Sequence, residues 1–339
     1  MAPHVNAMIA SVDLICPPIA NSSVSQISKN KNVVKILRLS DFYMIGGRAK
    51  AIFSDVHADD EGRVHFEIQV QGGASDKGFI DTGLLPPVAN INEEVEVTIG
   101  VSDISIIFCK KEKSGTRTVV ASFHPEDLLW RRGRAEEFIG GLEKYLELAS
   151  YDLLYVGKAT GTDSFDRLLK KGHDARQKIV SDEPQRYPGA HVSDEIYLFL
   201  FKVEPLIIKS WRPEDVIEDK DVMMSYSNSR LVSDAEKAFV SLLKPKYNNE
   251  LYRNYPKGKD GIYNEGYTGY SYSLSDGLVF RTNFGSMKGA RERGTTMSND
   301  ADFISIKGES VKLHIAGVDY ELDASCAEDG TPVSGPLDA

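Results

Sequence analysis

Six short segments rich in valine, isoleucine and phenylalanine follow one another early in the chain, and they constrain its fold more than any other feature. Clusters of glycine, aspartate and asparagine separate them. Strands this short and this closely spaced are typical of an antiparallel sandwich or barrel. The predicted strands cover residues 33–39, 48–53, 63–70, 95–99, 104–109 and 116–123. We therefore expect a β-rich recognition or partner domain at residues 31–130.

The segment before this domain has a different composition. Residues 1–30 mix apolar pieces with Pro17-Pro18 and a stretch rich in serine and asparagine. Such a mixture cannot bury much apolar surface by itself. We expect residues 1–30 to form a flexible arm.

Residues 135–255 alternate helical and strand-like patterns. Apolar residues recur at a period close to 3.6 in the helical parts, whereas the strand-like parts are short apolar runs. In order, the predicted elements are a helix at 135–149, a strand at 152–156, a helix opening at Ser164, a strand at 195–203 and a helix at 233–243 that ends before Lys244-Pro245. This order predicts a central α/β domain.

The last part of the chain becomes strand-like again. Segments 270–274, 278–282, 303–307 and 311–322 predict a β-rich extension over residues 256–322, with a mobile loop at 285–299. Residues 323–339 are acidic and rich in small side chains, which predicts a disordered tail. The expected fold class is therefore α+β and multidomain, with an N-terminal antiparallel β-sandwich or barrel, a central α/β domain and a C-terminal β-rich extension.

Composition narrows the class of protein. Of 339 residues, 41% are hydrophobic, and the net charge of −10 argues against a general nucleic-acid binder. Basic side chains nevertheless cluster within 167–178 and within 244–259, where they could hold a phosphate backbone or simply form a solvated face. No apolar run approaches the ~18 residues of a membrane span, and the three cysteines lie far apart. We expect a cytoplasmic protein that does not enter membranes.

One constellation in the central segment carries chemistry. It consists of Tyr155-Val-Gly-Lys-Ala, then Arg167 and His173, and later Glu236 ahead of Lys-Pro-Lys-Tyr-Asn248. In this order and spacing the constellation resembles the GIY-YIG nuclease family, whose second strand motif, arginine helix and metal-ligand helix follow in the same sequence. The resemblance covers roughly residues 150–250, about a third of the chain. It implies a GIY-YIG-like fold for the central domain.

The resemblance assigns three principal roles. Glu236 would hold one divalent ion, Mg²⁺ or Mn²⁺, since one carboxylate with waters and phosphate oxygens makes an acceptable shell for such an ion. Arg167 would clamp the scissile phosphate with its planar set of donors. Tyr155 would position or deprotonate the attacking water.

Five further residues receive supporting roles. Gly157 would leave room for the backbone to approach the substrate. Lys158 and Lys171 would contact phosphates, and Asn248 would bind substrate or order the site by hydrogen bonds. His173 would contact a phosphate or shuttle a proton, but it follows Arg167 by six residues. The family spacing is one helical turn, and six residues point the side chain elsewhere unless the helix ends at Gly172.

Each principal residue also has an ordinary structural interpretation. A tyrosine in a buried strand usually belongs to the core, and a helical arginine is usually solvated or ion-paired. Ser233 and Glu236 have the spacing of a capping box at a helix start, which would make Glu236 a capping residue. These alternatives stay open from the sequence alone.

The first motif of the family is not visible at its expected place. The resemblance implies a Gly-Ile-Tyr strand that closely precedes the second motif and pairs with it as a hairpin. Tyr145 precedes Tyr155 at the spacing expected for the first motif, but the residues around Tyr145 predict a helix. A literal Gly261-Ile-Tyr263 also occurs, but it follows Glu236, whereas the first motif should come before the second. Tyr151 is therefore our candidate for the second active-site tyrosine.

The resemblance implies a metal-dependent endonuclease that hydrolyses phosphodiester bonds in DNA, with RNA as an alternative substrate. By analogy, restriction or phage defence fits this build best. Cutting both strands of a duplex with one site per chain calls for a homodimer or for two successive events, and the N-terminal β domain would serve a protein partner or substrate choice. The alternative is a catalytically inactive module of the same fold that binds nucleic acid or a partner protein.

Overall fold

The computed structural model shows an α+β fold dominated by β-sheets, as expected for the fold class. It describes residues 4–91, 95–112, 115–159, 163–170, 173–215, 217–222, 225–318 and 321–323. Lys171 and residues 324–339 of the predicted tail lie outside the described residues. No helix in the described ranges is long and apolar enough to cross a membrane.

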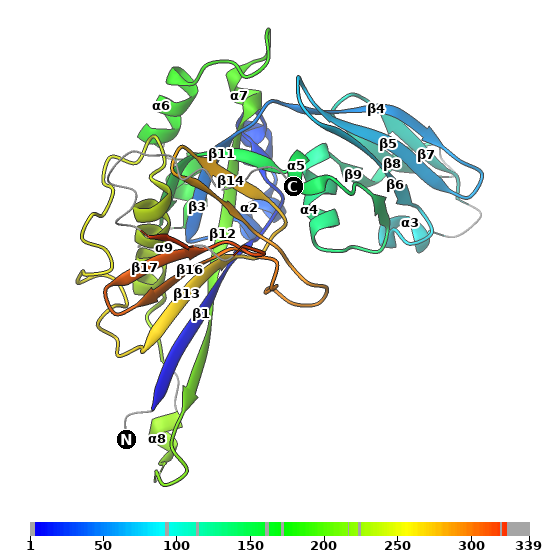
Figure 1. The fold of residues 1–339 in the computed structure, drawn as a ribbon. Coiled ribbons are helices and arrows are strands. Elements are labelled where there is room, and N and C mark those ends of the chain that lie inside the picture. The colour runs from blue at the N-terminus through cyan, green and yellow to red at the C-terminus, as the bar shows by residue number, and fades with distance from the viewer. Residues whose placement is uncertain are drawn as a thin grey trace.

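One mixed sheet organises the molecule (Figure 1). Its strands, in spatial order, are β15 (Gly285–Lys288), β14 (Val279–Thr282), β11 (Ser150–Lys158), β3 (Phe42–Gly47), β12 (Ile196–Ser210), β1 (Val5–Leu14), β13 (Gly269–Leu274), β16 (Phe303–Lys307), β17 (Ser310–His314) and β18 (Glu321–Asp323), while β2 (Ile19–Ala20) also pairs with β12. The pairs β1/β13 and β11/β14 are parallel, and the other pairs are antiparallel. Strands from both ends of the chain therefore complete one sheet.

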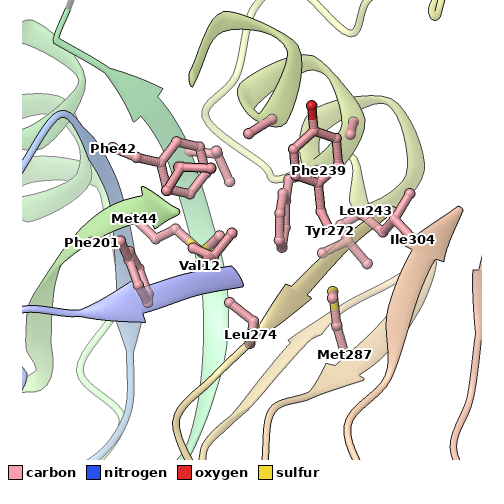
Figure 2. Close-up of a cluster of buried hydrophobic side chains, with 14 of the residues drawn as sticks. Val12, Phe42, Met44, Phe201, Phe239, Leu243, Tyr272, Leu274, Met287 and Ile304 are labelled. Carbon is pink, nitrogen blue, oxygen red and sulfur yellow. The ribbon is translucent and has the colours of Figure 1, made fainter. Parts of the chain in front are cut away.

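Helices cover both faces of this sheet. The long helix α9 (Asn228–Leu243) packs its apolar side against one face, where Phe239 and Leu243 meet Phe42, Met44 and Tyr272 (Figure 2). The opposite face is covered by α1 (Val24–Ile27), α2 (Lys31–Leu37), the π-helix η2 (Phe165–Lys170) and α6 (Asp174–Asp182). Side chains of β3 alternate between these two cores, as the strand period requires.

A β domain is inserted between β3 and β11 and projects from the main sheet (Figure 1). It contains a four-stranded sheet and a three-stranded sheet around its own apolar core. Its elements are β4 (Ala51–Ala58), β5 (Arg63–Val70), β6 (Ser75–Asp81), α3 (Pro86–Ala89), β7 (Val97–Val101), β8 (Ile106–Lys111), β9 (Arg117–Phe123), α4 (Pro125–Gly133), β10 (Ile139–Gly141) and α5 (Tyr145–Leu148). The remaining short helices are η1 (Asn21–Ser23), α7 (Val192–Glu195) and α8 (Asp219–Val222).

The N-terminal expectations need correction. Residues 1–30 are not a flexible arm, because β1 lies between β12 and β13 and buries Met8, Ala10 and Val12. The strand predicted at 33–39 is instead helix α2, since the Asn30 side chain caps it by accepting from the backbone N–H groups of Asn32 and Val33. The domain predicted at residues 31–130 therefore begins too early, because α2 and β3 belong to the main fold.

Three further expectations differ from the structure. The helix predicted at 135–149 is interrupted by β10, because Ala135 and Leu142 adopt positive φ and Gly141 pairs with β6. The segment after residue 256 is not a separate extension, since β13 pairs directly with β1. The loop predicted at 285–299 begins with strand β15, which pairs with β14.

Candidate active site

Two tyrosines from neighbouring strands face each other on the side of the sheet opposite α9. Strand β3 runs antiparallel to β11, so that Tyr43 lies opposite Gly157 and Ile45 opposite Tyr155. The Tyr43 and Tyr155 rings stack with centroids 6.1 Å apart and planes inclined by 23°. A Cβ atom on Gly157 would lie 2.6 Å from Tyr43 Cζ and 2.7 Å from Tyr155 Cε1. Gly157 therefore leaves room for the two rings.

A β-bulge in β11 decides which tyrosine reaches this pair. The register with β3 shifts between Leu153 and Tyr155. Before the bulge, Tyr151 and Leu153 belong to the core under α9, whereas Tyr155 belongs to the opposite cluster with Tyr43. An extra residue in a strand reverses the face of the residues that follow it. Tyr151 and Tyr155 thus point to opposite faces although they are four residues apart.

Tyr151 is a core residue, so our expectation that it is the second tyrosine of the site is wrong. Its side chain is 1% exposed, its hydroxyl accepts a hydrogen bond from Arg48 Nη1 at 3.0 Å, and its ring packs against Tyr197 and Phe199. Tyr43 occupies the place beside Tyr155. The signal for it is the apolar run Phe-Tyr-Met-Ile-Gly-Gly that forms β3, but the inserted domain separates this run from Tyr155 in the sequence.

His173 joins the tyrosine pair although its spacing from Arg167 is irregular. It is not on η2 but is the N-cap of α6, where its Nδ1 accepts from the Arg176 backbone N–H at 3.2 Å. Because Nδ1 accepts, the neutral ring carries its proton on Nε2, which lies 2.8 Å from Tyr43 Oη and donates to it. Burial, followed by the charges of Arg167 and Arg176, lowers the pKa of His173 to about 4, which keeps the ring neutral.

Opposing influences act on the Tyr155 hydroxyl, and its pKa is raised overall. Burial raises this pKa most, and the nearby Glu236 carboxylate raises it further. The positive charge of Arg167 and the neighbouring Tyr43 hydroxyl lower it in part. Burial and Tyr155 raise the pKa of Tyr43. Within the pair, the Tyr43 hydroxyl therefore lowers the pKa of Tyr155, whereas Tyr155 raises that of Tyr43.

Arg167 lies on η2 with an exposed side chain. Its charge lowers the pKa of Tyr43, Tyr155 and His173, so it acts electrostatically on all three. Within the described parts of the chain, no acidic side chain forms an ion pair with Arg167. Its guanidinium group is thus available for an anion from outside the protein.

Glu236 lies in the interior of α9, because the helix begins at Asn228 and its N-cap is Ser227. The capping-box interpretation of Ser233 and Glu236 therefore does not hold. The Glu236 side chain is 9% exposed, and its Oε2 lies 3.0 Å from Lys158 Nζ and accepts from the Tyr252 hydroxyl at 3.3 Å. This places Glu236 at the end of β11, on the same side as Lys158.

The donor set around Glu236 determines which metals it could hold. In the described residues, no group of three or more histidine, cysteine, aspartate or glutamate side chains could hold a metal ion. The Lys158 ammonium group forms ion pairs with two carboxylates: its Nζ lies 3.0 Å from Glu236 Oε2 and 3.8 Å from Asp260 Oδ2. The residues fit an ion such as Mg²⁺ that binds through one carboxylate, waters and substrate phosphate, and not a metal held entirely by protein ligands.

Asn248 fixes the position of β11. Its side-chain Oδ1 accepts from the Val156 N–H at 2.9 Å, and its Nδ2 donates to the Val156 carbonyl at 2.8 Å. The adjacent Tyr247 N–H donates to the Leu154 carbonyl at 3.0 Å. Both ends of the Asn248 amide are therefore engaged within the protein, which agrees with the expected role of ordering the site by hydrogen bonds.

Five elements contribute to one end of the β3/β11 pair. Tyr43, Tyr155 and His173 are in contact there, and the charges of Arg167 and Glu236 act on Tyr155. Only four of these five residues are expected from the sequence, because Tyr43 precedes the inserted domain. Lys158 joins them through Glu236. Comparisons with protein-family models, with curated proteins and with solved structures return no match for this chain.

Proposed function

We propose that this chain is a metal-dependent phosphodiesterase of the GIY-YIG type that cuts a nucleic-acid backbone. The observation that carries the proposal is the tyrosine pair on β3 and β11, with His173 bonded to Tyr43. The resemblance implies a tyrosine strand that pairs as a hairpin with the second motif, and β3 pairs with β11 in that way. The large insertion between the two strands accounts for the apparent loss of the first motif.

The groups around Tyr155 favour it as the acceptor of a proton from water. His173 Nε2–H donates to Tyr43, and the Tyr43 hydroxyl lowers the pKa of the neighbouring Tyr155. The positive charge of Arg167 also favours the Tyr155 anion. Tyr155 would first lose its own proton to solvent, and its phenolate would then take a proton from the attacking water as the water oxygen bonds to phosphorus and the bond from phosphorus to the 3′ oxygen breaks. The 3′ oxygen leaves with the bonding electron pair and takes a proton from solvent.

The remaining groups hold the phosphate. Arg167 would bind two of its non-bridging oxygens, because its planar guanidinium has no partner among the described acidic side chains. Glu236 would hold one Mg²⁺ or Mn²⁺ ion, which supplies Lewis-acid stabilisation of the developing charge when bound. Lys158, which pairs with Glu236, would turn to the phosphate once that carboxylate has another partner.

DNA is the proposed substrate, and restriction or antiviral defence is the proposed role. The catalytic groups lie at one end of a hairpin and offer little surface for selection, so the inserted β domain would choose the substrate or a protein partner. A homodimer would allow both strands of a duplex to be cut. These steps rest on the resemblance and on the presence of a separate β core.

The proposal is tested by incubating the protein with supercoiled plasmid or structured RNA in Mg²⁺ or Mn²⁺. We expect nicking or linearisation by the wild type and loss of cleavage of at least about 10²-fold in Glu236→Gln and Arg167→Ala. Glu204→Gln and Arg281→Ala, which change exposed residues on β12 and β14, serve as matched controls. Equal cutting by all five proteins would show that the activity is a contaminant and contradict the proposal.

The same experiment separates the alternative function. If no metal supports cleavage but the wild type binds DNA with a strong dependence on salt, the fold would be a non-catalytic binding module. In that case Arg167→Ala should weaken binding, and Tyr155→Phe should leave it unchanged. Cleavage that needs Tyr155 excludes this alternative.

A further inference from the structure

A third tyrosine beside the site adopts a backbone conformation that its residue type disfavours. Tyr252 follows α9 and has a φ of 48°, in the left-handed region. The Cβ atom makes this region unfavourable for bulky side chains, and such residues cluster at functional positions. Packing of the ring against the main core and the cation of Lys237, 5.8 Å from the ring centroid, hold it there.

This conformation brings the Tyr252 hydroxyl to Glu236. The hydroxyl donates to Glu236 Oε2 at 3.3 Å. Burial raises the pKa of Tyr252, and the charges of Glu236 and Glu250 raise it further. The Tyr252 O–H is thus the donor and the Glu236 carboxylate the acceptor in this hydrogen bond.

Two donors from different elements meet on the same carboxylate oxygen. Lys158, at the end of β11, and Tyr252, on the segment after α9, both contact Glu236 Oε2. Together they restrict rotation of the carboxylate and leave its other oxygen, Oε1, outside these two contacts. Outer partners of this kind orient metal-binding side chains in other sites.

We propose that Tyr252 is a positioning residue, whose hydroxyl fixes the Glu236 carboxylate so that Oε1 is presented to the divalent ion. This inference rests on the proposed function, because it takes Glu236 as the metal-binding residue. Lys158 can leave the carboxylate when the ion binds, since its side chain is long and flexible. Tyr252 is held by its backbone and by packing, so it keeps the carboxylate in place in both states.

Asp234, on the same helix, provides an internal comparison. It is fully buried and accepts from the hydroxyls of Tyr255 at 2.6 Å and Tyr272 at 3.0 Å. Tyr255 belongs to the same segment as Tyr252, so Tyr→Phe at either position removes one hydrogen bond from a tyrosine hydroxyl to a carboxylate of α9. The Glu236 carboxylate lies near Tyr155, whereas the Asp234 carboxylate lies in the core.

The test is the affinity of the full-length protein for Mn²⁺, measured by the EPR signal of the free ion, together with the Mg²⁺ concentration that gives half-maximal cleavage. We expect Tyr252→Phe to weaken Mn²⁺ binding about tenfold and to raise the Mg²⁺ requirement by a similar factor. Tyr255→Phe should lower the melting temperature and leave both metal measurements within twofold of the wild type. Unchanged metal affinity and Mg²⁺ requirement in Tyr252→Phe would overturn the positioning role.

Glu236→Gln distinguishes failure of this inference from failure of the proposed function. If Glu236→Gln abolishes Mn²⁺ binding and cleavage while Tyr252→Phe changes neither, only the role of Tyr252 is refuted. If Glu236→Gln leaves Mn²⁺ binding and cleavage unchanged, the proposed metal site itself is wrong. An equal loss of metal affinity in Tyr252→Phe and Tyr255→Phe would indicate a general effect on α9 and also refute the positioning role.

Discussion

The two halves of strand β11 each carry one tyrosine, but the two tyrosines lie on opposite faces of the sheet. The first half pairs with β14 and β3 and places Tyr151 in the core, where Arg48 bonds to it. The second half follows the bulge, presents Tyr155 to the opposite face, and has its edge closed by Asn248 instead of a strand. One additional residue in a strand thus separates a structural tyrosine from one that can take part in chemistry.

The largest expected contrast is between the two tyrosines of this strand. Tyr155→Phe removes the proposed proton acceptor, so cleavage should fall by about 10²- to 10⁴-fold with little change in stability. Tyr151→Phe leaves the buried Arg48 with one hydrogen bond fewer, which should cost about 1–3 kcal/mol of unfolding free energy. Single-turnover cleavage and urea unfolding of both variants measure the two effects.

Circular dichroism of both variants provides the control, because each change keeps the ring and its packing. The comparison would fail if Tyr151→Phe lost cleavage as severely as Tyr155→Phe while remaining folded. That outcome would place Tyr151 in the catalytic chain despite its burial.

Two glycines should show the same division with smaller effects: Gly157 in the second half of β11, and Gly46 of β3, which pairs with Leu153 in the first half. In Gly157→Ala the added Cβ would push Tyr43 and Tyr155 apart, so cleavage should drop by about 10- to 100-fold. In Gly46→Ala the Cβ would meet Phe199 at 2.9 Å and Tyr151 Cβ at 3.2 Å, so stability should fall by about 1–3 kcal/mol. Cleavage rates normalised to the folded fraction would reveal the contrast, and equal rates for both variants would contradict it.

Sequence reasoning predicts the second half of β11 better than the first. The apolar run in the sequence locates the strand. The sequence also groups Tyr155, Arg167 and Glu236, and in the structure the charges of Arg167 and Glu236 act on Tyr155. The bulge is invisible in the sequence, since it depends on pairing with β3. Tyr43 could not be located because it reaches the site through long-range pairing, after a complete domain intervenes.

The same reasoning explains the errors in the fold. β1 lies at the N-terminus, where disorder is common, and its burial depends on β12 and β13, which come much later in the chain. His173 does not fit the expected spacing of one helical turn after Arg167, because that spacing assumes that both residues lie on one helix. In the structure it caps a separate helix, and that role sets its orientation toward Tyr43.

The stability of β11 after the bulge should depend on Asn248, which hydrogen-bonds to the edge of the strand. Asn248→Ala leaves the Val156 N–H and carbonyl without their side-chain partner. We expect a loss of about 2 kcal/mol in unfolding free energy and a roughly tenfold lower cleavage rate, since β11 is then less firmly placed. Asn249→Ala, at the adjacent exposed position, is the matched control and should change neither quantity. Hydrogen exchange at Val156 would report the loosening directly, and unchanged protection there would refute the role.

The smallest expected effect is a pH dependence of the unfolding free energy, which arises from His173 beside the second half of β11 and has no counterpart beside the first half. The folded pKa of His173 is about 4, below the ordinary value of 6.5. Above pH 6.5 the ring is neutral in both states. As the pH falls toward 4, His173 binds a proton in the unfolded chain but stays neutral in the folded protein. The free energy of unfolding therefore decreases, by about 1 kcal/mol between pH 7 and 5.5. His173→Asn can still cap α6 but does not titrate, so its urea midpoint should fall less over this range. Arg48, the charged neighbour of Tyr151 in the first half, stays protonated throughout, and an equal fall in wild type and His173→Asn would assign the pH dependence to other groups.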